Sequence, residues 1–186
     1  AYESPGYSEA ADAAWAAVAL LRNSLDRPTT VSAFQPELKD VSNEANRFSG
    51  SFEGDSRIPG LMADLAAQWL AAGDHQLALD YGSRVLTAPT ASPAERYAAW
   101  QVMARIRQEE GDYGLAERAW GQALNLAESE RLANVTEEQV SAIRKQLATS
   151  VYRQAELAVS SGRLGEAVGH FRRVDSVLPG SDVAIR

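Results

Sequence analysis

Residues 100–124 read WQVMARIRQEEGDYGLAERAWGQAL, and this stretch decides the fold class. Apolar residues recur at intervals of three and four on both sides of Gly111, which is the periodicity of amphipathic helices. Gly111 is expected to end the first helix, because glycine takes the left-handed backbone conformation without a side-chain clash. The stretch therefore predicts a helical hairpin whose turn lies at Gly111.

Two further segments carry the same landmarks, so the chain contains a repeat. The turn glycines of the three copies are Gly73, Gly111 and Gly162. Each is followed five positions later by an alanine, namely Ala78, Ala116 and Ala167. A side chain this small lets two helices cross closely. Trp120 and Phe171 come one helical turn after the alanine, and we expect them to fill the gap beside the next hairpin.

These landmarks resemble the tetratricopeptide repeat over residues 58–186, most strongly in the copy around Gly111. The signature of that family combines an aromatic and a small pair in the first helix with a turn glycine, an alanine, a late aromatic, a second alanine and a closing proline. Gly82 departs from it at the late aromatic, and Arg107 replaces a first-helix tyrosine. The resemblance implies an all-α fold, a right-handed superhelical stack of antiparallel helix hairpins that forms an α-solenoid.

The repeat region divides into three predicted copies. We expect them over about 58–92, 94–130 and 137–180. The landmark alanines are 38 and 51 residues apart, against about 34 in the family. Thr136 and Gln139 form a capping box, and helical periodicity then continues from Val140 to Ala155. The inserted residues are therefore expected to lengthen a helix. Residues 183–186 are expected to begin a further helix.

Residues 1–57 are less regular than the rest. Residues 11–15, ADAAW, resemble residues 116–120, AERAW, which predicts a helix over about 7–24. A second, short helix is expected over about 36–48, with Pro36 in its first turn. We interpret the whole segment as an irregular helical region that holds a degenerate or partial repeat and a loop.

Composition excludes several classes of function. Hydrophobic residues make up 45% and charged residues 23% of the 186-residue chain, as in ordinary globular proteins. A formal net charge of -7 argues against binding to nucleic acid. Apolar segments are shorter than the roughly 20 residues of a membrane span, so we expect no membrane insertion. Cysteine is absent, which excludes disulfides and thiolate metal sites.

Residues capable of chemistry do not form a recognisable catalytic pattern. His75 and His170 lack neighbours at ligand spacing and are interpreted as surface histidines. The acidic runs 109–112 and 137–138 are interpreted as solvated faces, since adjacent helical residues point apart. Phosphate-loop, nucleophile-elbow and zinc motifs are missing. We therefore expect no enzyme, no metal and no cofactor. The four tryptophans are expected to pack in the core: Trp15, Trp69, Trp100 and Trp120.

The family resemblance implies a concave groove, lined by the first helices, where a ligand binds. By register, its candidates are Ala63, Ala67, Leu70, Gln101, Arg105, Gln108, Tyr152, Glu156 and Val159. Family members that bind the terminal carboxylate of a peptide use Lys and Asn on their first helices. Ala63 and Ala67 occupy positions of that kind here, which disfavours binding of a terminal carboxylate. We predict a short apolar or amphipathic peptide, held by Leu70 and Tyr152, with Arg105 and Gln108 fixing its direction.

These expectations favour a non-catalytic protein–protein interaction scaffold, a fragment of a larger bacterial protein, with a protein or peptide partner. Residues 48–63 are similar to the inter-repeat linkers of envelope-associated bacterial repeat proteins. That likeness favours the periplasm or cell envelope over the cytoplasm. Two alternatives stay open: the helical superstructure domain of a larger envelope enzyme, and a homo-oligomerisation module.

Overall fold

The computed structural model describes residues 9–25, 37–129, 132 and 135–178. Within these residues all regular structure is helical, which confirms the predicted all-α class. The helices are α1 (Ala10–Leu25), α2 (Leu38–Ser51), α3 (Ile58–Ala71), α4 (His75–Thr87), α5 (Pro93–Glu109), α6 (Tyr113–Ser129), α7 (Glu137–Ser160) and α8 (Leu164–Val177). None of these helices is both long and apolar enough to cross a membrane.

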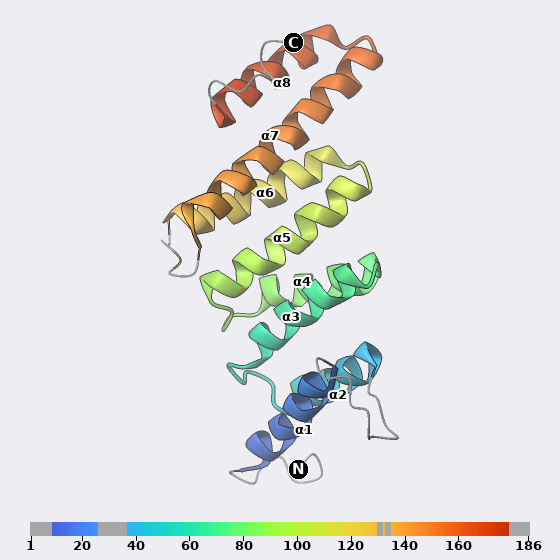
Figure 1. Cartoon of the computed structure of the whole chain (residues 1–186), viewed down its shortest axis with the longest axis vertical. Coiled ribbons are helices and arrows are strands. Elements are labelled where there is room, and N and C mark those ends of the chain that lie inside the picture. The colour runs from blue at the N-terminus through green and yellow to red at the C-terminus, as the bar shows by residue number, and fades with distance from the viewer. Residues whose placement is uncertain (1–8, 26–36, 130–131, 133–134, 179–186) are drawn as a thin grey trace.

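Helices that follow one another in the sequence also lie against one another in space. α3 packs on α4, α5 on α6 and α7 on α8, while contacts of α4 with α5 and of α6 with α7 join these pairs. Figure 1 shows the pairs arranged along the long axis, with α1 and α2 at one end and α8 at the other. α3 also contacts α5, so the first helices of these two pairs touch directly.

The three turn glycines end helices as predicted. Gly73, Gly111 and Gly162 have φ values of 81°, 79° and 72°, in the left-handed region that favours glycine. In each turn the next residue's N–H donates back across the glycine, as from Asp112 to the Arg107 carbonyl at 2.9 Å. This pattern satisfies carbonyls that the helix end would otherwise leave unpaired.

The landmark alanines lie in the core, where two helices cross. Ala78, Ala116 and Ala167 are buried. Gly82, which departs from the family pattern, faces α5: a Cβ built there would be in ordinary van der Waals contact with Met103 Cγ at 3.5 Å and would lie 3.9 Å from the Ala99 carbonyl oxygen. α5 therefore passes close to α4 at the point where an aromatic residue was expected, and a bulky side chain would push the two helices apart.

The insertion before the third pair lengthens a helix, as predicted. α7 has 24 residues. Thr136 caps its start: the Thr136 hydroxyl accepts from the Gln139 N–H, and the Gln139 side chain accepts from the Thr136 N–H at 2.9 Å. The apolar positions Val140, Ile143, Leu147, Val151 and Ala155 are all buried. The helix expected over 183–186 lies outside the described residues.

Arg57 joins the first two helices to α3. Its guanidinium lies 5.2 Å from the ring centroid of Trp15 in α1 and 5.5 Å from that of Phe48 in α2. It also pairs with Asp55 at 2.6 Å and with Asp12 at 2.8 Å. The hydrogen bonds that the Arg57 guanidinium donates to the Asp55 carboxylate raise the pKa of Arg57 and lower the pKa of the Asp55 carboxyl. Position 36, where α2 was expected to begin, lies outside the described residues.

The tryptophans pack as predicted, but only one is enclosed. Trp120 is 2% exposed. Trp15 and Trp69 are partly buried against the cluster of α1 to α5, and Trp100 against the cluster of α5 to α7. The Trp69 indole donates to the Ser42 hydroxyl at 2.9 Å, which ties α3 to α2.

Candidate functional site

A pocket of ≈ 500 Å³ opens between α5 and α7, with one residue of α6 beneath it. It is lined by Gln101, Arg105, Gln108, Glu109, Trp120, Gln139, Ala142, Ile143 and Gln146. The lining residues of α5 and of α7 recur at helical spacing, so each set belongs to one face of its helix. Three of the predicted site residues, Gln101, Arg105 and Gln108, lie here together.

A chain of hydrogen bonds runs across the pocket from α6 through α5 to α7. The Trp120 indole N–H donates to Gln108 Oε1 at 3.1 Å, and Gln108 Nε2 donates to Gln146 Oε1 at 3.1 Å. An indole can only donate, so it determines which end of the Gln108 carboxamide faces it. The Gln146 Nε2 group has no hydrogen-bond partner among the described residues, which leaves it available to a ligand.

Arg105 is the only Lys or Arg among the described residues that line the pocket. It is exposed, and no described residue forms an ion pair or hydrogen bond with it. Neighbouring arginines are paired: Arg107 with Glu110 at 2.8 Å, and Arg144 with Glu128. The positive charge available inside the pocket is therefore that of one guanidinium.

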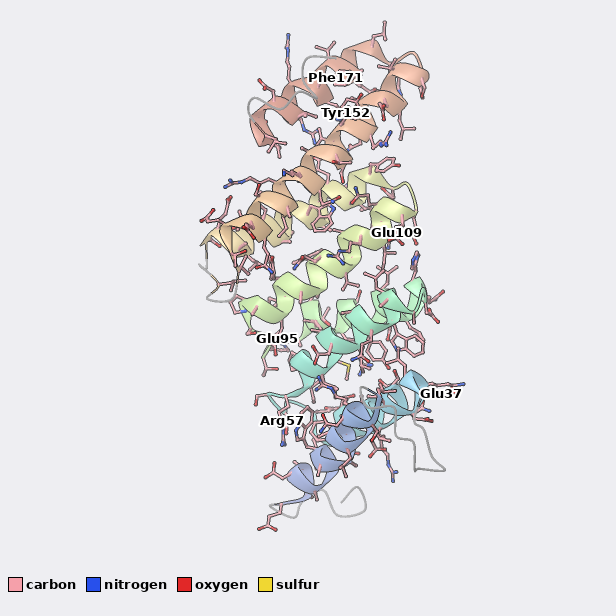
Figure 2. The ribbon with its side chains drawn as sticks, viewed as in Figure 1. Glu37, Arg57, Glu95, Glu109, Tyr152 and Phe171 are labelled. Carbon is pink, nitrogen blue, oxygen red and sulfur yellow. The ribbon has the colours of Figure 1, made fainter. Side chains whose placement is uncertain are left out.

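The pocket combines an apolar floor with a polar rim. Ile143 and Trp120 are 3% and 2% exposed and form the floor. Glu109 lines one edge, and its Oε2 lies 3.0 Å from Nε2 of His75 in α4. Figure 2 shows Glu109 near the end of α5, above α4. Its carboxylate is therefore already engaged by a side chain of α4.

The chain matches no protein-family model, no curated protein and no solved structure.

The other predicted groove residues do not line this pocket. Tyr152 packs against Phe171 of α8, with ring centroids 5.7 Å apart, and Figure 2 shows the two side by side. Glu156 pairs with Arg153 at 2.7 Å on the same helix, and that hydrogen bond raises the pKa of Arg153. Leu70 packs, partly buried, against the core of α1 to α5. The structure thus separates Leu70 and Tyr152 from Arg105 and Gln108.

Ala63 requires a correction. Register with the family repeat predicts Ala63 on the groove, but this residue is 6% exposed and belongs to the core cluster of α1 to α5. The physical reason is that α3 contacts both α4 and α5, which leaves less of its surface open than the register implied. Ala67 and Val159 are exposed but lie outside the pocket.

Sequence reasoning missed the α7 wall of the pocket, which consists of Gln139, Ala142, Ile143 and Gln146. Register with the family repeat places the groove candidates of this helix at Tyr152, Glu156 and Val159, all in its second half. Because α7 is long, its first half is the part that faces α5. One signal was present: Gln101 and Gln108, like Gln139 and Gln146, are seven residues apart, which places each pair on one helical face.

The histidines are tied to neighbouring side chains. His75 contacts Glu109, and Nδ1 of His170 lies 3.3 Å from an Arg173 nitrogen. Over the part of the chain that the structure describes, no three His, Asp or Glu side chains gather in a metal-binding group.

Proposed function

We propose that this chain is a non-catalytic interaction scaffold and that it binds a peptide segment of a partner protein in the pocket between α5 and α7. The observation that carries the proposal is the unpaired guanidinium of Arg105 in an open pocket of ≈ 500 Å³. That volume lies in the range of about 300–1,000 Å³ typical of ligand sites. An apolar floor and a few polar groups at the rim are the usual features of such sites.

We propose further that the helix pairs form a right-handed superhelical stack of the tetratricopeptide type. Support comes from the three left-handed turn glycines and from the buried alanine five residues after each. In such a stack the first helices of successive pairs line one face. α5 and α7, which form the two walls of the pocket, are both first helices. A location in the cell envelope is part of the proposal and rests on the linker likeness of residues 48–63.

Blocking the pocket tests the function. Ala142 is exposed on α7 and lines the pocket, so Ala142→Trp would fill the space without disturbing the core. Displayed random 12-residue peptides would be selected on the wild-type chain and measured on the variant by fluorescence polarisation. We expect affinity to fall at least tenfold. Gln122→Trp is the matched control, since Gln122 is exposed on α6 outside the pocket. Equal binding to all three proteins would refute the pocket as the site.

A second candidate, self-association, is favoured by apolar side chains at the end of α7 and on α8. The exposed ones are Leu157 (49%), Val159 (47%), Leu164 (63%) and Val168 (49%). α7 and α8 pack on each other, and apolar surface exposed on adjacent helices often marks contacts between protein molecules. Light scattering at several concentrations would separate the candidates, because a mass that stays monomeric excludes self-association of this chain.

A further inference from the structure

The pocket carries four glutamines in a regular arrangement. Gln101 and Gln108 lie on α5, and Gln139 and Gln146 lie on α7, seven residues apart in each case. Seven residues span about 10.5 Å along a helix axis, because each residue rises about 1.5 Å. All four side chains line the pocket, and the bond from Gln108 to Gln146 connects the two walls.

This spacing fits an extended chain better than a helical one. An extended peptide advances about 3.3 Å per residue, so three of its residues cover about 10 Å. Its backbone N–H and C=O groups are unpaired and need partners when they leave water. A carboxamide supplies two donors and an acceptor, which match those groups. A helical ligand would already have paired its backbone groups, and the glutamines would find little to bind.

Arg105 adds a charge requirement. It lies between Gln101 and Gln108 on the same helix and is the only Lys or Arg of the described lining. A guanidinium presents paired donors that match the two oxygens of a carboxylate. Glu109, the one acidic residue among the described residues of the lining, contacts His75 of α4 instead. The charge complementary to this pocket is therefore a carboxylate on the ligand.

From these contacts we infer that the α5–α7 pocket binds an extended acidic peptide. Gln101, Gln139, the Nε2 group of Gln146 and the second N–H of Gln108 hydrogen-bond its backbone, and Arg105 pairs with the carboxylate of an Asp or Glu side chain. Apolar neighbours of that side chain rest on Ile143 and Trp120, the buried floor. This inference rests on the proposed function and specifies the class of ligand.

The test uses pools of capped seven-residue peptides, because the natural ligand is unidentified. Three pools share randomised flanks and differ only in the central residue, which is Glu, Gln or Lys. A fourth has Glu at the centre and N-methyl groups on the two amides beside it. Each is titrated into the ¹⁵N-labelled chain and followed by NMR. We expect the Glu pool to shift the side-chain NH₂ signals of the four glutamines, with about tenfold tighter apparent affinity than the Gln pool.

Substitution of Arg105 tests whether its guanidinium binds the carboxylate of the central Glu. Arg105→Gln should remove the preference for Glu over Gln, so that the two pools bind within about twofold of each other. Arg118→Gln is the matched control, because Arg118 is exposed and unpaired on α6 outside the pocket, and it should retain the tenfold preference. N-methylation should weaken the Glu pool about tenfold if the backbone is bound.

The outcomes separate this inference from the function on which it rests. Pocket shifts that are equal for the Glu, Gln and Lys pools, or unaffected by N-methylation, would overturn the inference while leaving peptide binding in place. If none of the pools shifts the pocket signals, both proposals fall. A preference for Glu that survives Arg105→Gln would show that the carboxylate binds elsewhere.

Discussion

The two halves of α7 face different surroundings. The first half forms one wall of the α5–α7 pocket, with an open rim of glutamines over a buried floor. The second half packs on α8, where Tyr152 lies edge-on to Phe171 and closes the space between the helices. Beyond that contact, Leu164 and Val168 of α8 are exposed. One long helix therefore serves two packing tasks, because its two halves meet different neighbours.

The largest difference in stability is expected when the aromatic residue that packs against each half of α7 is truncated to alanine. Trp120 is buried beneath the pocket and donates to Gln108, whereas Phe171 is only partly buried. Trp120→Ala should lower the free energy of unfolding by about 3–5 kcal/mol, and Phe171→Ala by about 1–2 kcal/mol. Urea denaturation followed by circular dichroism measures both. If the two variants lost equal stability, the pocket floor would be no better packed than the α7–α8 end.

Replacing either of two glycines near the pocket with alanine should change the free energy of unfolding by a smaller amount, and the two changes should have opposite signs. Gly111 has a φ of 79°, so Gly111→Ala should cost about 1 kcal/mol through backbone strain, although space for a Cβ exists there. Gly121 lies within α6 and also has room for a Cβ, so Gly121→Ala should stabilise by about 0.5–1 kcal/mol. Thermal unfolding of the pair measures the contrast. Stabilisation by Gly111→Ala would contradict the left-handed turn.

The smallest change in stability is expected on the exposed face of α8. Leu164→Ser combined with Val168→Ser should alter the free energy of unfolding by no more than about 0.5 kcal/mol per site, because both side chains are exposed. Chemical denaturation gives that value, and light scattering on the same samples gives the mass. A large loss of stability would mean that these residues are covered in solution and would favour self-association.

Local features of the fold were predictable because they depend on short stretches of chain. Gly111 ends a helix through its own backbone preference, and Thr136 begins one through hydrogen bonds within four residues. Placement on a shared groove was less predictable. Ala63 turned out to be buried, and Tyr152 to face Phe171, because both depend on how neighbouring helices are rotated.

By itself the sequence determined the all-α class of the described residues, the three turn glycines and the buried stripe of α7, since periodicity and capping act within a few residues. The tertiary structure alone decided that Gln101 and Gln108 would face Gln139 and Gln146 across a pocket. These two pairs are separated by more than 30 positions in the chain. Only the packing of α5 and α7 against α6 sets the rotation that brings their side chains to one opening.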